Sequence, residues 1–442
     1  MTPRHPISLH RLSWLAGPLV AFAALLALLS VINGSSAPSV PAVAEDGSGG
    51  LPARGDTAAL IEDLRAAASA APGDAEAQVA LGDAYYQRSR ETGDPSLYAR
   101  ADRAYEAALI GDPDSFSALA GQATVALARH RFADGLALAR RAHRLAPAVV
   151  APYASFVDGL IENGRYRAAG VALERMVGLK PNLAAYSRIS YYRELHGDLP
   201  GAAEALRLAV SAGSGTVEGS AYIRSLLGDF EAMRGRYGAA ELAYREALAI
   251  DPAYGGARSG LALLRAGRGE PGPAIEALRA QVGDPPSPDA LIELGEVEQA
   301  AGRLAAARRH YAEGLAIERR LLTQGAGVDA GITLNEAEHG DPERAARLGR
   351  TAWTSAPSVS SADAYSWALH RAGRIAAASR LSAEAMRLGS RDPEFLYHAG
   401  MIARARGEDA RAARLLGRLL DQSPRFSALY APRARQALSA LR

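Results

Sequence analysis

The chain repeats one pattern at a fixed interval, and this repeat limits the folds open to it. Pro113, Pro147 and Pro181 lie 34 residues apart, and the same interval separates Pro252 from Pro286. Between successive prolines come two apolar stretches at helical spacing, with a glycine between them. Proline ends a helix, and glycine readily takes the left-handed conformation found at helix termini. Each unit therefore predicts a helix, a turn and a second helix.

Residue size differs between the two helices of a unit. Tyr153 and Phe156 are large residues on a first helix. Small residues recur on the second helices, at Ala169, Ala202, Ala240 and Ala307. Glycines mark the expected turns, at Gly164, Gly197, Gly235, Gly302 and Gly373. Small side chains let neighbouring helices approach closely, and many stacked pairs bury a core that one pair could not.

One stretch makes the repeat class specific. Residues 222–252 read YIRSLLGDFEAMRGRYGAAELAYREALAIDP and resemble the tetratricopeptide repeat (TPR) consensus. The matching residues are Leu227, Gly228, Gly235, Ala240, Tyr244, Ala247 and Pro252. The resemblance covers about residues 57 to 442. It implies an all-α solenoid of about ten stacked helix-turn-helix units that form a right-handed superhelix.

The units divide the chain into predicted domains. They are expected near 75–113, 116–147, 150–181, 183–214, 218–252, 255–286, 288–322, 326–357, 360–390 and 393–424. The irregular TQGAGVDAG, near Gly325 and Gly327, predicts a flexible point between two sub-arrays, 57–322 and 326–442. A leading helix and a trailing helix are expected to cap the array.

The N-terminus carries a different signal. Residues 1–11 form a basic flank with Arg4 and Arg11, and residues 12–32 are uncharged and mostly apolar. That run predicts one hydrophobic helix long enough to cross a bilayer. It serves either as an uncleaved anchor, which its length favours, or as a cleaved signal. The basic flank predicts an inside N-terminus and an extracytoplasmic array, joined by a flexible Gly/Ser/Pro linker at 33–56.

Composition excludes several kinds of chemistry. The chain has no cysteine, so disulfides, thiolate catalysis and cysteine-ligated zinc are ruled out. The formal net charge is +2, which gives no sign of a nucleic-acid partner in the totals. No G-x-S-x-G elbow, P-loop or H-E-x-x-H motif occurs, so we expect no enzyme and no cofactor.

Candidate binding residues follow from the resemblance alone. In TPR proteins the first helices line the concave face, where peptides or whole proteins bind. Carried over, the inward positions here are Asp158, Arg188, Tyr191, Asp229, Asp363, Trp367, His370, Tyr397 and His398, with Glu162, Glu194 and Arg404 beside them. Tyr191, Trp367 and Tyr397 are the candidate anchors. The alternative is that these side chains form the solvated or half-packed face of each helix.

These features predict a non-enzymatic scaffold that binds a protein or peptide through its concave groove. The N-terminal run points to the cell membrane or to secretion, in an envelope assembly or export process, and the resemblance is to bacterial TPR proteins. One alternative is an accessory protein for metal or solute handling that uses the neighbouring His370 and His398. Another is an adaptor tethered to the cytoplasmic face of the membrane.

Overall fold

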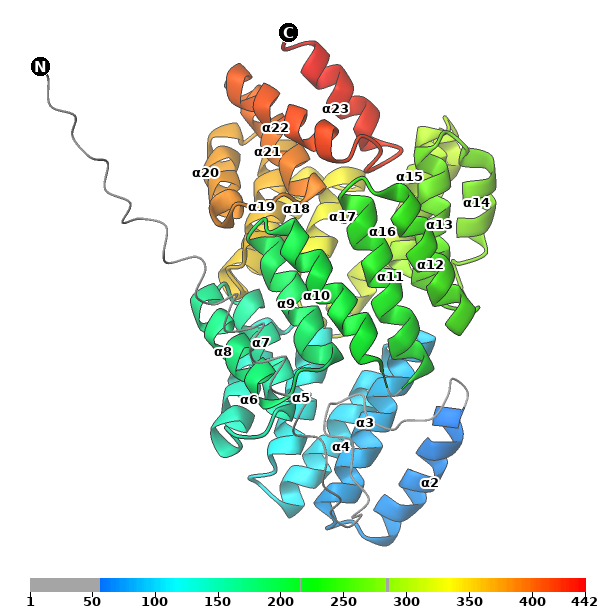
Figure 1. Cartoon of the computed structure of the whole chain (residues 1–442), viewed down its shortest axis with the longest axis vertical. Coiled ribbons are helices and arrows are strands. Elements are labelled where there is room, and N and C mark those ends of the chain that lie inside the picture. The colour runs from blue at the N-terminus through cyan, green and yellow to red at the C-terminus, as the bar shows by residue number, and fades with distance from the viewer. Residues whose placement is uncertain (1–55, 215, 284–285) are drawn as a thin grey trace, which may run out of the picture. The chain divides into compact units, whose positions relative to one another are not determined.

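The computed structural model describes residues 56–214, 216–283 and 286–442, and every regular element in these ranges is a helix (Figure 1). The leading helix is α2 (Asp56–Ala70). The first helices of the pairs are α3 (Ala75–Thr92), α5 (Phe116–Ala128), α7 (Ala151–Glu162), α9 (Leu183–Leu195), α11 (Val217–Met233), α13 (Gly255–Gly267), α15 (Pro288–Ala300), α17 (Ala330–His339), α19 (Val359–Arg371) and α21 (Pro393–Ala405). The second helices are α4 (Ser96–Gly111), α6 (Phe132–Leu145), α8 (Tyr166–Leu179), α10 (Leu199–Ala212), α12 (Tyr237–Ile250), α14 (Pro271–Arg279), α16 (Leu304–Thr323), α18 (Pro342–Ser355), α20 (Ile375–Ala385) and α22 (Asp409–Gln422). A short 3-10 helix, η1 (Met386–Leu388), follows α20, and α23 (Tyr430–Ser439) comes last.

The described residues therefore form an all-helical, TPR-like solenoid. The helix pairs fall where the sequence predicted units, and α2 and α23 lie where the leading and trailing helices were expected. Side chains at the N-caps explain many of the helix starts. Ser115, Asn182 and Thr216 each accept a hydrogen bond from a backbone N–H in the first turn of α5, α9 and α11.

The turns inside the pairs have the predicted glycine geometry. Gly164, Gly197, Gly235, Gly302 and Gly373 all have φ between 68° and 77°. This left-handed conformation costs glycine little and other residues more. In the second unit a histidine takes the same role, because His130 has φ 58° between α5 and α6.

Close packing between pairs depends on small residues, as predicted. Ala169, Ala202, Ala240 and Ala307 are all buried. A tyrosine on a second helix also fits against two glycines. The ring of Tyr244 occupies the space that a Cβ would need at Gly228, on its own first helix, and at Gly260, on the next one.

A second set of contacts joins segments far apart in the sequence. We call it the seam. It brings the turns at 129–131, 164–166, 197 and 235–237 against the loops at 324–329, 357–359, 389 and 422–425. The Tyr166 hydroxyl accepts the backbone N–H of Val359 at 2.7 Å, and the Tyr237 hydroxyl accepts that of Arg425 at 2.8 Å.

The seam also crosses the predicted sub-array boundary. The backbone N–H of Gly327 donates to the carbonyl of Arg129 at 2.8 Å, and His130 pairs with Asp329 at 3.1 Å. The loop near Gly325 and Gly327 is thus held against the second unit. Flexing at that point stays a prediction.

The membrane prediction falls mostly outside these ranges. Residues 1–11, the apolar run at 12–32 and all but the last residue of the predicted linker are not among the described residues. Of the helices that are described, none combines the length and apolar character needed to cross a bilayer.

Candidate functional site

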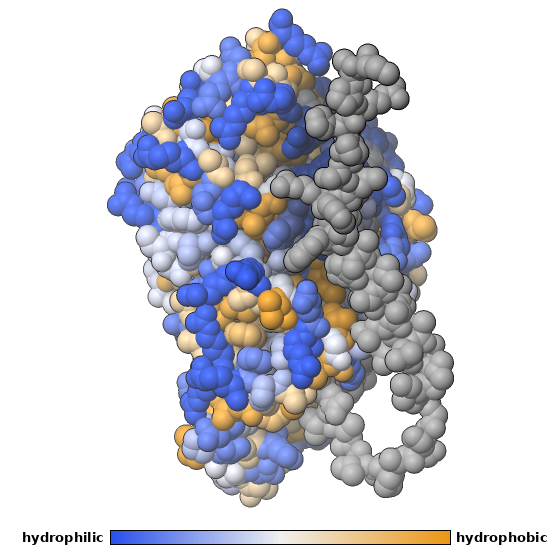
Figure 2. All heavy atoms as spheres, turned by 60° about the vertical axis from the view of Figure 1, so that its left-hand side comes forward, coloured by the Kyte–Doolittle hydropathy of each residue, from blue (hydrophilic) through white to orange (hydrophobic). Residues whose placement is uncertain are grey.

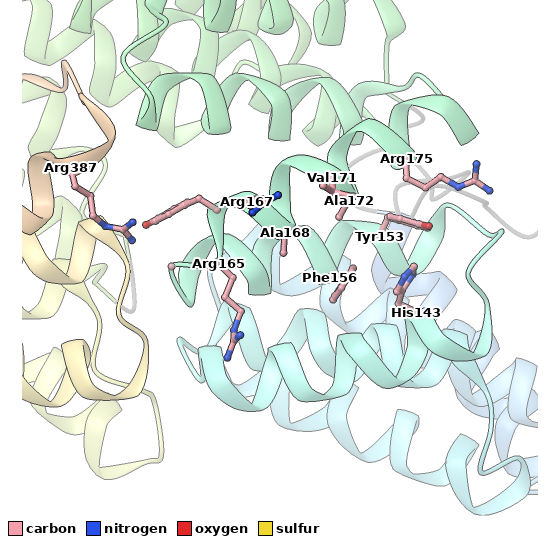
Figure 3. A pocket seen from close by; sticks show the side chains of 12 residues that line it. His143, Tyr153, Phe156, Arg165, Arg167, Ala168, Val171, Ala172, Arg175 and Arg387 are labelled. Carbon is pink, nitrogen blue, oxygen red and sulfur yellow. The ribbon is translucent and has the colours of Figure 1, made fainter. Parts of the chain in front are cut away.

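A groove of about 880 Å³ lies on the second helices α6 and α8 and reaches the first helix α7 (Figure 3). The opposite rim comes from Arg387 in η1, across the seam. The lining residues are His143, Tyr153, Phe156, Gly164, Arg165, Tyr166, Arg167, Ala168, Val171, Ala172, Arg175 and Arg387. The volume lies within the range typical of ligand-binding clefts.

The floor of the groove is aromatic and apolar. The rings of His143 and Phe156 stack with centroids 4.6 Å apart, and Tyr153 meets His143 edge-on at 4.7 Å. Burial lowers the pKa of His143, so the imidazole is neutral at pH 7, and no described residue bonds its buried Nδ1. Val171 stands beside this floor with 65% of its surface exposed. Figure 2 shows one face of the molecule, on which hydrophobic residues form groups between hydrophilic ones.

The rim of the groove is basic. Arg165, Arg167 and Arg175 are exposed, and no carboxylate of the described residues forms an ion pair with them. Nearby Arg140 shows the resulting crowding of charge: its pKa is lowered by burial, then by Arg165 and Arg144. Unpaired guanidinium groups of this kind are suited to binding carboxylates or phosphates.

Tyr166 connects the groove to the seam. Its hydroxyl accepts the Val359 N–H, and the guanidinium of Arg387 lies 5.0 Å from its ring centroid. Burial raises the pKa of Tyr166 to about 12, so the phenol stays neutral. The turn must be glycine here, because a Cβ on Gly164 would overlap the Pro357 carbonyl oxygen.

A smaller cavity of about 290 Å³ lies on the other side of the same turn. Its polar lining includes Glu162, Tyr191, His130 and Asp329. The Tyr191 hydroxyl donates to Glu162 at 3.3 Å. Burial raises the pKa of Glu162 to about 7, and the charge of Asp158 adds to the shift.

The predicted residues of the third to fifth units form hydrogen bonds with other residues of the protein. Arg188 donates to Asp158 at 2.6 Å and to the carbonyl of Ala154 at 3.1 Å. Asp229 accepts the hydroxyl of Tyr244 at 2.7 Å, and burial raises its pKa to about 6. The candidate anchor Tyr191 borders the smaller cavity.

The structure brings the five C-terminal candidates together: four of them are buried and His370 is half-buried. The Trp367 ring stacks on His370 at 4.7 Å and on His398 at 4.4 Å. Trp367, Tyr397, His398 and Asp363 are all buried, at 2–6% exposure. Trp367 donates to Glu338 at 2.7 Å, and His398 is 2.7 Å from Asp363. Trp367 and Tyr397 thus pack the core and present no open surface to a partner.

The pKa values of the two histidines in this cluster are shifted in opposite directions. Burial lowers the pKa of His370 to about 4. Burial also acts to lower the pKa of His398, but the charge and hydrogen bond of Asp363 outweigh it, so the net shift is upward. No cluster of three or more potential metal ligands occurs in residues 56–214, 216–283 or 286–442.

The sequence reasoning missed the groove. Its signal was present in the run Gly164-Arg165-Tyr166-Arg167, where two arginines flank a tyrosine after the turn. Those positions belong to the turn and the second helix. The resemblance had directed attention to the first helices.

Comparison with known proteins finds structural likenesses at low sequence identity. No family model matches the chain, and no curated protein matches it. Human IFIT1, solved as a dimer with PPP-AAAA, is 16% identical with a TM-score of 0.48, over 78% of this chain and 72% of that one. The TPR domain of P58(IPK) is 15% identical with a TM-score of 0.24, over 83% and 99%. YrrB, described as a TPR protein with an unusual peptide-binding site, is 17% identical with a TM-score of 0.28, over 45% and 96%. At these values the likenesses carry no argument about what this chain binds.

Proposed function

We propose that the chain is a non-enzymatic TPR-like scaffold that binds a protein or peptide partner. The groove on α6, α7 and α8 is the observation that carries this proposal. It combines an aromatic floor, an exposed Val171 and arginines without acid partners. Apolar surface ringed by unsatisfied polar groups is the composition of a binding site.

The groove is unsuited to acid-base or nucleophilic catalysis. Its lining contains no carboxylate, serine or threonine. Its single histidine has a lowered pKa and contacts two aromatic rings rather than a nucleophile. Catalysis of those kinds needs a base within hydrogen-bond reach of the group that it activates.

We also propose that the array lies outside the cytoplasm, anchored by residues 12–32 or secreted, and that it serves an envelope assembly or export process. The support is the apolar run behind Arg4 and Arg11. Protease should cleave the array in cells whose outer envelope has been opened while the cell membrane stays intact. If the array is cleaved only after the cell membrane is broken, the array lies in the cytoplasm and the proposed topology is wrong.

The scaffold proposal is tested by site-specific photo-crosslinking in cells that express the full chain. A photoreactive residue replaces Val171 in one strain and Leu242 in another. These residues are 65% and 59% exposed, and each lies seven residues after its turn glycine, Gly164 or Gly235. We expect one defined adduct from position 171 and none from 242. Equal adducts at both positions, or none at 171, would contradict binding at the groove.

A further inference from the structure

We propose that the segment bound in this groove is an acidic peptide that carries a bulky apolar side chain. Its carboxylates would pair with Arg165, Arg167, Arg175 and Arg387, and its apolar group would cover Val171 and the aromatic floor. This inference rests on the proposed scaffold function and adds the chemistry of the partner.

Charge complementarity is the first argument. Arg165, Arg167 and Arg175 project from one turn and one helix, and no ion pair joins them to a carboxylate of the described residues. Some other exposed arginines are paired, such as Arg245 with Glu241, whereas Arg308 and Arg309 have no ion pair among the described residues. The groove differs from those sites because three unpaired arginines border one apolar floor, and its lining contains no carboxylate. The groove is therefore a local excess of positive charge on a chain whose formal net charge is only +2.

The position of Arg387 is the second argument. It comes from η1, on the far side of the seam, and forms an ion pair with Glu384. Arg387 also lies over Tyr166, on the opposite side of the groove from Arg165 and Arg167 (Figure 3). A ligand with several carboxylates can contact both sides, whereas a single small anion can neutralise only one.

The floor favours a peptide over a nucleic acid. Single-stranded nucleic acids bind through free aromatic faces on which bases stack. Here His143 and Phe156 stack on each other, and Arg387 covers Tyr166. Val171 and Ala168 offer aliphatic contact instead, which suits an apolar side chain.

The test uses the full 442-residue chain in mild detergent and three fluorescein-labelled dodecapeptides. The first alternates Glu and Asp around a central Phe, the second replaces Phe by Ser, and the third replaces every acid by Lys. A labelled 12-nucleotide RNA is the fourth probe. We expect the first peptide to bind, the second to bind at least about fivefold more weakly, and the Lys peptide and RNA to show no saturable binding.

Two variants locate the site. Arg167→Glu/Arg175→Glu reverses two exposed charges, and it should lower the affinity for the first peptide at least about tenfold. The matched control, Arg308→Glu/Arg309→Glu, reverses two exposed arginines of α16 and should change its affinity less than about twofold. Val171→Asp, at an exposed position, should also weaken binding without unfolding the chain, which circular dichroism can verify.

Several outcomes would overturn the inference. Equal weakening by both double variants would mean non-specific attraction. Equal affinity for the Phe and Ser peptides would show that no apolar contact contributes to binding. Saturable binding of RNA and of no peptide would show that the ligand is a nucleic acid. If crosslinking at Val171 yields an adduct but the acidic peptide fails to bind, this inference is wrong and the scaffold proposal stands. If both experiments fail, both proposals are wrong.

Discussion

The seam uses the same turn twice, and the two copies have different surroundings. At Gly164-Arg165-Tyr166 and at Gly235-Arg236-Tyr237, a left-handed glycine precedes a tyrosine whose hydroxyl accepts a distant backbone N–H. An arginine covers each ring, at 5.0 Å for Tyr166 and 4.1 Å for Tyr237. We call these the first and second turn contacts.

At the second turn contact, the polar and charged side chains have partners. Tyr237 also bonds Ser423 at 3.1 Å, Gln422 donates to the Met233 carbonyl at 3.3 Å, and buried Glu231 has three arginine neighbours. At the first turn contact, no cationic side chain of the described residues pairs with Glu162, and Arg165, Arg167 and Arg175 have no carboxylate partner there. Equivalent positions explain the difference, because Arg167 and Arg175 correspond to Gly238 and Glu246. The same turn motif is thus fully paired in one place and borders a groove with unpaired arginines in the other.

The largest expected effect is at the second turn contact. Glu231 is 3% exposed and pairs with Arg207, Arg234 and Arg236, at 3.1, 3.3 and 3.9 Å. Among the described residues, Glu231 is the carboxylate that pairs with Arg234, so we expect Glu231→Gln to lower the free energy of unfolding by about 3 kcal/mol. Chemical denaturation would measure this, and an unchanged midpoint would show that solvent already screens the cluster.

Replacing turn glycines by alanine distinguishes two costs to stability. One is the strain of a positive φ, and the other is the steric overlap with a loop across the seam. Gly164→Ala would overlap the Pro357 carbonyl, and Gly235→Ala would overlap that of Gln422. We expect each to cost about 2–3 kcal/mol. Gly302→Ala has the same positive φ with open space around it and should cost only about 1 kcal/mol. Equal losses of melting temperature in all three variants would mean that the seam contributes nothing.

Glu162→Gln should act in the opposite direction from Glu231→Gln. The pKa of Glu162 is raised from its ordinary 4.5 to about 7, in a cavity that it shares with Tyr191 and Asp329, near Asp158. The folded state therefore binds the proton more tightly, and the stability that this contributes is lost as pH rises from about 4.5 through about 7. The variant should be more stable than wild type by about 1–2 kcal/mol at pH 8 and about equal at pH 4.5. Unfolding measured at both pH values checks this, and a constant difference would contradict it.

The smallest expected loss of stability comes from removing the hydroxyl of Tyr166 or of Tyr237. Tyr166→Phe leaves the N–H of fully buried Val359 without a partner, so we expect a loss of about 1–2 kcal/mol. Tyr237→Phe frees the N–H of exposed Arg425, which water can bond, and Ser423 keeps its bond to the Ala232 carbonyl. That loss should be about 0.5–1 kcal/mol. Hydrogen exchange at residue 359 should rise in the first variant, and a larger loss at Tyr237 would reverse the comparison.

The helical repeat could be predicted because its causes are local. Spacing of apolar residues, turn glycines and closing prolines act over a few residues, and Ala169 and Ala240 are buried where expected. The seam could not be predicted, because Tyr166 and Val359 are 193 residues apart and meet only through the geometry of the whole stack. The burial of two candidate anchors could not be predicted for a related reason. Periodicity placed Trp367 and Tyr397 on helix faces but gave no sign that neighbouring helices cover them.

The sequence distance across the seam bears on synthesis of the chain. Most solenoids are stabilised by neighbouring repeats, so each can settle as the next one emerges. Here the turn at Tyr166 cannot form its hydrogen bond until Val359 has been synthesised, 193 residues later. The turn at Tyr237 likewise needs Arg425, which is synthesised 188 residues later. At roughly 5–20 residues per second, each turn stays unpaired for about 10–40 s on the ribosome. The early repeats therefore expose the faces of the seam, including the groove, to chaperones before synthesis of the later repeats.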